Sequence, residues 1–176
     1  RLSTGNSESE IAKLNATGSG TLSEDTSAIL QEAITLYQDT DGAFNPLMYP
    51  IMQAWGFPTH EYRVPEDSEI QSLLQLTDPS KMQFSAETGA VSFSVSGMEL
   101  DLGGIAKGYT SSAMMDCFRS NGVTSGMVSL GGNVQTIGAK PDGSLWKVAI
   151  QNPTAEEDAD FLGILETKDC AVITSG

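Results

Sequence analysis

The sequence changes its hydrophobic period at residue 103, and this change limits the folds open to the chain. From Met82 to Leu102 apolar residues alternate with polar ones, a pattern typical of strands with one buried face. After Gly103-Gly104 the apolar residues recur at helical spacing as far as Asn121-Gly122, where a glycine is expected to end a helix. Turn sequences interrupt the alternating part, so we predict an antiparallel meander that leads directly into a helix.

Further helices and strands are expected on both sides of this region. Ser23 is a typical helix cap, and Glu24 and Asp25 after it favour a helix N-terminus; this helix is expected to end near Gly42. A short helix is expected around 70–74, and later strands over 127–130, 134–137 and 146–150. Because the strands form hairpins and not regular βαβ repeats, we predict an α+β fold: a mostly antiparallel sheet with a few packed helices, in one domain over residues 1–176.

Charge excludes several classes of partner. The chain has 176 residues, a net charge of −14 and a pI near 4.2. A nucleic-acid or anionic-membrane surface would need a basic patch, so neither partner is expected. An anionic ligand would have to be held locally, by backbone amides, a lysine or a divalent cation.

Cysteine and histidine chemistry is not expected either. The sequence has one histidine, so a histidine-based triad or a multi-imidazole zinc site is not predicted. Cys117 falls on the apolar face of the expected helix and Cys170 in an expected buried strand, so both are interpreted as core residues.

The corner at Gly103-Gly104 is a candidate phosphate site. Glycines allow close backbone approach, a helix N-terminus offers unpaired N–H groups, and Lys107 adds a positive charge. The order of residues matches neither the P-loop nor the dinucleotide fingerprint. The alternative is a tight strand-to-helix turn beside a lysine that only faces solvent.

The corner at Gly103-Gly104 is part of one of several short sequence motifs that are distributed along the chain. They are 40–46 (TDGAFNP) leading to 55–57 (WGF), 101–109 (DLGGIAKGY), 128–133 (VSLGGN), 146–153 (WKVAIQNP) and the terminal 174–176 (TSG). In this order, over nearly the whole chain, the sequence resembles the ApbE family, the FAD:protein FMN transferases. Relative to that family the chain is expected to be incomplete at both ends, lacking an opening strand region and a C-terminal portion.

The resemblance implies an activity, its cofactors and its partners. Such enzymes use Mg²⁺ to cleave FAD, release AMP and attach FMN to a Thr or Ser hydroxyl of a target flavoprotein. The nucleophile then belongs to the partner, so no catalytic residue is assigned in this chain. The resemblance also implies an exported, lipid-anchored protein on the outer side of the cytoplasmic membrane. A homo-oligomer is left open, because missing strands would leave a sheet edge uncovered.

Residue roles are carried over position by position. The resemblance implies FAD contacts at Ala43, Phe44, Asn45, Asp101, Lys107, Gly131, Gly132 and Ser175. It gives the backbone carbonyl of Gly104 to Mg²⁺ and places the remaining metal ligands, an Asp and a Thr four residues later, beyond Gly176. A fragment without these ligands is expected to be inactive.

Each assignment has a structural alternative. Asp101 is also a good helix cap, Lys107 a typical exposed residue, and Gly131-Gly132 a typical hairpin turn. Trp55 and Phe57 are interpreted as core residues. The chain has Asn45-Pro46-Leu47 where the family usually has Asp-x-Thr, and Ser112 where an Asp is usual. These departures leave a non-catalytic flavin-binding protein as an alternative function. An FAD pyrophosphatase is a second alternative, because the sequence does not distinguish water from a protein hydroxyl as the attacking group.

Overall fold

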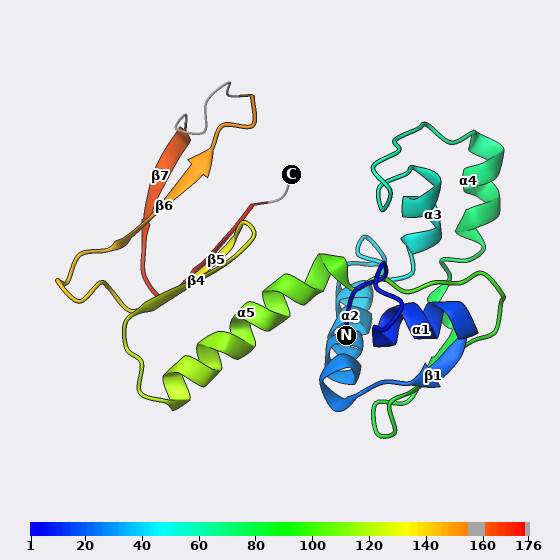
Figure 1. The fold of residues 1–176 in the computed structure, drawn as a ribbon, viewed down its shortest axis with the longest axis horizontal. Helices are drawn as coiled ribbons and strands as arrows, with labels where there is room; N and C mark the ends of the chain where they lie inside the picture. Colours follow the sequence, from blue (N-terminus) through cyan, green and yellow to red (C-terminus); the bar gives the residue numbers. More distant parts are fainter. Residues whose placement is uncertain (155–160, 175–176) are drawn as a thin grey trace. The chain divides into compact units, whose positions relative to one another are not determined.

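A computed structural model describes residues 1–154 and 161–174 of the chain (Figure 1). The chain divides into two compact units, Arg1–Ala106 and Lys107–Gly176. Each unit combines helices with strands, and every strand pair in them is antiparallel, so the predicted α+β class is confirmed. The expectation of one domain over residues 1–176 stays a prediction.

The first unit holds most of the helices and a small sheet. Its three strands pair in the order β1-β3-β2, with Ser19 opposite Ser92 and Met82 opposite Phe93. Its elements are α1 (Glu10–Thr17), β1 (Ser19–Thr21), α2 (Glu24–Asp39), α3 (Tyr49–Ala54), α4 (Asp67–Leu74), the 3₁₀ helix η1 (Pro79–Lys81), β2 (Met82–Phe84) and β3 (Ala90–Phe93). The helices expected after Ser23 and around 70–74 are therefore present as α2 and α4.

The third strand of this sheet is not the one predicted. Residues 98–102 belong to no strand or helix, and β1 takes the third place in the sheet. The Asn15 side-chain amide donates to the Leu100 carbonyl at 2.9 Å, and its oxygen accepts from the Leu100 N–H at 2.8 Å. The Asn15 side chain thus makes the backbone hydrogen bonds that a neighbouring strand would otherwise make. The alternation in this segment reflects burial, because Leu100 and Leu102 have no exposed surface.

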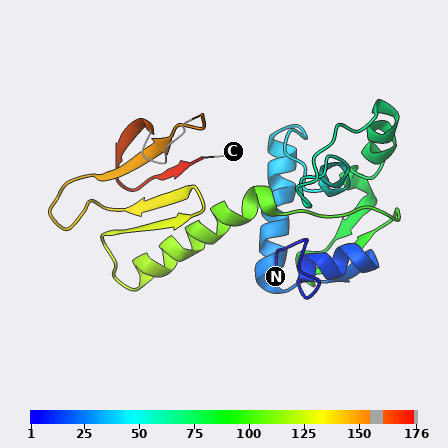
Figure 2. The same ribbon diagram turned by 45° about the horizontal axis from the view of Figure 1, so that its top comes forward.

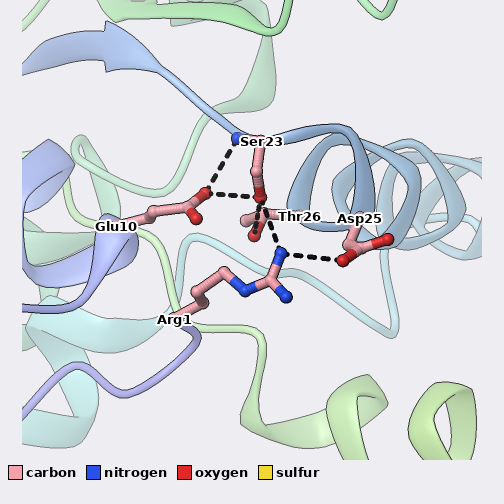
Figure 3. A network of polar contacts seen from close by, with 5 residues as sticks. All are labelled: Arg1, Glu10, Ser23, Asp25 and Thr26. Carbon is pink, nitrogen blue, oxygen red and sulfur yellow. Dashed lines mark hydrogen bonds and ion pairs between the residues drawn. The ribbon is translucent and has the colours of Figure 1, made fainter.

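A carboxylate joins α1 to the start of α2 (Figure 3). Glu10 accepts hydrogen bonds from the Ser23 N–H at 2.9 Å and from the Ser23 hydroxyl at 3.0 Å. Arg1 pairs with Asp25 at 2.7 Å beside this contact. Ser23 is the cap residue that the sequence predicts, but its side chain caps no N–H of α2. Instead, the Ser23 hydroxyl donates to the Glu10 carboxylate.

The second unit contains most of α5 (Gly103–Ser120) and two sheets. The strands β4 (Gly126–Leu130), β5 (Asn133–Ile137) and β8 (Ala171–Ile173) pair in the order β4-β5-β8, and Figure 2 shows them side by side. Met115 of α5 packs with Val128 and Ile137, and Met114, Phe118 and Leu130 surround this core. The strands predicted at 127–130, 134–137 and 146–150 are all present.

The second sheet of this unit is a ribbon of β6 (Trp146–Gln151) and β7 (Phe161–Thr167). Four apolar side chains of β7 are 47–68% exposed: Phe161, Leu162, Ile164 and Leu165. Because side chains of a strand point alternately to its two faces, exposed apolar groups lie on both faces of β7.

Three expectations about buried residues are wrong. Cys117 and Cys170 are both exposed. Cys117 lies outside the face of α5 that packs on the sheet, which is centred on Met115. Cys170 lies in the turn before β8 and not inside a strand. Phe57 is 51% exposed, and only its neighbour Trp55 is partly buried.

Candidate functional site

The first group of candidate residues lies at the corner where α5 begins; we call it the corner cluster (Ala43, Phe44, Asn45, Asp101 and Gly104). The Asp101 N–H donates to the Pro46 carbonyl at 2.8 Å. A Cβ atom placed on Gly104 would lie 3.1 Å from Cε2 of Phe44, so the ring covers this glycine closely. The fold therefore brings together two sequence blocks that are more than fifty residues apart.

Asp101 supports the start of α5. Its Oδ1 accepts a hydrogen bond from the Gly103 N–H at 2.8 Å, and the residue is half-buried. This contact supports the alternative in which Asp101 stabilises the start of the helix. A role toward FAD stays a prediction, and it is compatible with the cap because a carboxylate has a second oxygen.

Asn45 explains one departure from the family pattern. Its Nδ2 donates to the Thr77 carbonyl at 2.8 Å, while its Oδ1 accepts from the Leu47 N–H at 2.9 Å. A carboxylate at this position would be unable to donate to Thr77. The amide therefore closes the turn that presents Ala43, which is exposed, and Phe44, which is half-buried.

The second group of candidate residues, the hairpin cluster, consists of Lys107, Gly131 and Gly132. Gly131 and Gly132 form the two-residue turn between β4 and β5, with φ of 54° and 88°. Two positive φ values are the requirement of a tight hairpin turn, so the hairpin alternative is confirmed. Lys107 is exposed, and its Nζ donates to the Gly131 carbonyl at 3.3 Å. The lysine is therefore held at this turn rather than extended into solvent.

Thr174 binds to the hairpin cluster, although no role was predicted for it. The Gly132 carbonyl accepts from the Thr174 N–H at 3.0 Å and from its hydroxyl at 3.1 Å. The sequence did indicate this region, because Thr174 belongs to the terminal Thr-Ser-Gly block. Ser175, which was the candidate in that block, lies outside the described residues.

Asn133 and Ser111 are further residues that the sequence reasoning missed. Both are almost fully buried, and the Ser111 hydroxyl lies 3.4 Å from Oδ1 of Asn133. This contact joins α5 to β5 directly after the glycine turn. A buried serine in a helix does not stand out in the hydrophobic pattern, so nothing in the sequence indicated Ser111. Asn133 could have been noticed, because it ends the block 128–133.

The first turn of α5 offers a hydrogen-bond donor. Its Gly103 N–H is bonded to Asp101, and its Ile105 N–H to the Leu102 carbonyl at 3.1 Å. The Gly104 N–H between them has no partner among residues 1–154 and 161–174. A first-turn N–H at the positive end of a helix dipole is suited to a phosphate oxygen.

The metal prediction has limited support from the described residues. In residues 1–154 and 161–174, no group of three or more His, Cys, Asp or Glu side chains is placed to hold a metal ion. The predicted ligand, the Gly104 carbonyl, would be one oxygen of a site that needs others.

A titratable side chain beside the corner cluster is Glu99. Burial raises the pKa of Glu99, and its hydrogen bond with Gln53 of α3 partly offsets this effect. The contact ties α3 to the segment that carries Asp101.

Together these features define the class of protein: an α+β chain in which a Gly-Gly corner starts a long helix that carries a lysine. The ApbE family model matches residues 1–176. The chain belongs to the ApbE family.

Relatives and solved structures agree with this membership. A Klebsiella pneumoniae protein named FAD:protein FMN transferase is 33% identical over 178 residues, covering 99% of this chain and 54% of the relative. A Treponema pallidum protein of the same name is 30% identical, covering 99% and 52%. The crystal structure of an ApbE protein from Thermotoga maritima has a TM-score of 0.86 and 30% identity, covering 99% of this chain and 57% of that one. The flavin transferase ApbE of Vibrio cholerae has a TM-score of 0.82 and 29% identity.

The chain spans about half the length of the curated relatives it matches. The match likewise covers 57% of each of these two solved structures and 99% of this chain.

Proposed function

We propose that this chain belongs to an FAD:protein FMN transferase and supplies part of its FAD site. The observation that carries the proposal is the match to proteins of that name along the whole chain. The contacts within each cluster support it: the Asp101 N–H bonds to Pro46 beside Phe44 and Asn45, and Lys107 bonds to Gly131. The FAD contact proposed at Ser175 falls outside the described residues.

The chemistry of the proposed reaction is a phosphoryl transfer. A Thr or Ser hydroxyl of the acceptor protein attacks the FMN phosphorus of FAD, forming a new P–O bond. The bond from that phosphorus to the bridging oxygen breaks, AMP leaves with that oxygen, and the hydroxyl proton is transferred to a base. Binding and orientation of the diphosphate are the tasks that the residues of this chain are proposed to perform.

Within each unit, specific groups suit these tasks. The open Gly104 N–H can donate to a diphosphate oxygen, and the free oxygen of Asp101 can accept from a hydroxyl or ring donor of FAD. Lys107 can exchange its 3.3 Å hydrogen bond with Gly131 for a stronger, charge-assisted bond to a phosphate.

Magnesium dependence is part of the proposal, with the Gly104 carbonyl as one ligand. A divalent cation would neutralise negative charge on the diphosphate oxygens when bound.

The test is to incubate the full-length protein with FAD, Mg²⁺ and an acceptor flavoprotein. We expect AMP release together with FMN bound covalently to the acceptor, detected by mass spectrometry. Release of AMP with free FMN would favour the pyrophosphatase alternative, in which water is the attacking group. FAD binding without AMP release would favour a non-catalytic flavin-binding protein, and absence of FAD binding by calorimetry would end the proposal.

We also propose, from the family resemblance alone, export and lipid anchoring of the protein. Among the described residues, no helix has the length and apolar character that crossing a bilayer requires. Labelling of intact cells with a membrane-impermeant reagent tests the location.

A further inference from the structure

Exposed aromatic side chains gather on the loop that follows α3; we call residues 55–64 the aromatic loop. Phe57 is 51% exposed and Tyr62 is 66% exposed. The Phe57 ring stacks on Trp55 at a centroid distance of 6.4 Å and meets Tyr62 edge-on at 5.9 Å. His60 contacts Tyr62 through both its ring and a 3.1 Å hydrogen bond to the hydroxyl. Clustered exposed aromatics of this kind are typical of binding surfaces and not of a solvated loop.

The aromatic loop is held in one shape by its own backbone. The Arg63 N–H donates to the Trp55 carbonyl at 3.2 Å, which closes the loop at its base. Gly56 has φ of 78°, and a Cβ atom there would lie 2.0 Å from the Glu61 carbonyl oxygen, so only glycine fits. A second anchor is the paired contact between the Arg63 guanidinium and Glu69 of α4. A loop fixed in this way presents its aromatic rings at little further cost in entropy.

The charge around these rings is negative. Glu61, Glu66 and Asp67 are exposed and form no ion pair in residues 1–154 and 161–174. The one arginine of the loop, Arg63, is neutralised by Glu69. A cationic side chain would therefore meet both carboxylates and aromatic faces here, and each attracts it. A second copy of the chain, itself at −14, is the less suitable occupant.

The aromatic loop is also connected to the corner cluster within the first unit. It begins directly after α3, and α3 follows the turn that carries Phe44 and Asn45. Gln53 of α3 hydrogen-bonds Glu99, two residues before Asp101. The aromatic loop is therefore joined, through α3 and the hydrogen bond between Gln53 and Glu99, to the segment that carries Asp101.

We propose that the aromatic loop docks a lysine- or arginine-containing segment of the flavin-accepting protein. This inference rests on the proposed function, because it assigns the surface where that reaction's protein substrate binds. The aromatic rings supply the buried contacts, and the acidic residues select a basic segment and speed its encounter.

The probe is a labelled synthetic peptide with one threonine flanked by lysines, and its control has glutamates in place of the lysines. Binding to the full-length protein is measured by fluorescence anisotropy at low and at high salt. We expect the lysine peptide to bind at least about tenfold more tightly than the glutamate peptide, with the difference shrinking at high salt.

The test variant is Phe57→Ala with Tyr62→Ala, and the matched control is Leu74→Ala, an exposed apolar residue on α4. We expect the double variant to lose roughly tenfold or more in lysine-peptide affinity, and the control to match the wild type. Glu61→Lys is the second test variant. It alters only an exposed side chain and is expected to weaken the lysine peptide and to strengthen the glutamate peptide.

Calorimetry with FAD separates this inference from the proposed function. Normal FAD affinity with unchanged peptide affinity in both test variants would overturn the docking surface alone. Loss of FAD binding in the wild type would overturn the proposed function, whatever the peptide does. Concentration-dependent dimerisation that the double variant abolishes, with no peptide binding, would identify a second copy as the occupant and overturn the proposal.

Discussion

Glu10→Ala tests the contact that joins α1 to α2 in the first unit. The change removes the carboxylate that accepts from the Ser23 N–H and the Ser23 hydroxyl (Figure 3). It leaves a backbone N–H at the start of α2 without its protein partner. We expect the first unit to lose stability, and the second unit to be unaffected.

The magnitude follows from the two hydrogen bonds. An intramolecular hydrogen bond typically contributes about 0.5–1.5 kcal/mol to stability. Hydrogen bonds to a charged group are worth roughly 1.5–3 kcal/mol when buried, but Glu10 is only partly buried, and water can replace part of the loss. We expect a loss of about 1–2 kcal/mol for Glu10→Ala and less for Glu10→Gln, which keeps an acceptor oxygen.

The assay is urea unfolding followed by tryptophan fluorescence. The chain has two tryptophans, Trp55 in the first unit and Trp146 in the second. In a Trp146→Phe background the signal therefore reports the first unit alone. Glu8→Ala is the control, because its ion pair with Lys13 is exposed and is worth little. A loss of stability no larger than that of the control would refute the reasoning.

The stabilising effect of Glu10 should depend on pH in a defined direction. Partial burial by itself raises the pKa of Glu10, but hydrogen bonds from Ser23 and Thr26 and the charge of Arg1 outweigh it, and the pKa is lowered. A lowered carboxyl pKa stabilises the folded state above the unfolded pKa of roughly 4.3, and this stabilisation is lost as the pH falls through the folded pKa. The difference between wild type and Glu10→Gln should therefore be largest near neutral pH and shrink in acid.

Three further substitutions test the hairpin cluster and the contact between Asn15 and Leu100. Lys107→Ala should weaken FAD binding to the full-length protein by about 1.5–3 kcal/mol, the value of a charged hydrogen bond; unchanged affinity by calorimetry would refute its role. Gly132→Ala should destabilise the second unit more than Gly143→Ala, since φ is similar (88° and 84°) but only Gly132 has an atom, 2.7 Å away, in the path of the new Cβ; equal unfolding midpoints would contradict this. Asn15→Ala should cost about 2–4 kcal/mol in urea unfolding, because it strips both backbone partners from Leu100, a buried residue; a loss below 1 kcal/mol would show that water replaces the amide.

The sequence predicted those parts of the fold that depend on local patterns. The start and end of α2 followed from Ser23 and Gly42, and the β4–β5 hairpin followed from the glycine pair between apolar runs. These signals are local, since caps and turns are formed by neighbouring residues. Membership of the ApbE family also followed, because it rests on the order of motifs along the chain.

What the sequence could not predict depends on distant contacts. Alternation over residues 98–102 indicates burial on one face, but a strand needs a partner, and here Asn15 takes that place from eighty-five residues away. In the same way, helical spacing placed Cys117 on the buried face of α5, whereas Cys117 is exposed and Met115 is the residue that is fully buried. In the candidate site, the hydrogen bonds from Thr174 to Gly132 join residues that are forty-two positions apart in the chain. No local sequence pattern predicts such a contact.

The β6–β7 ribbon has a consequence for work with this chain in solution. The outer edge of β7 pairs with no other strand among the described residues, and its Phe-Leu-Gly-Ile-Leu run (161–165) contains no charge. Short uncharged segments with free edges can stack into cross-β fibrils. The nearest charged residues on the ribbon, Lys147 and Glu166, neutralise each other across it at 3.5 Å. If another part of the protein or a partner covers this edge, we expect the chain to stay in solution. If further copies of β7 pair with it, we expect fibrils.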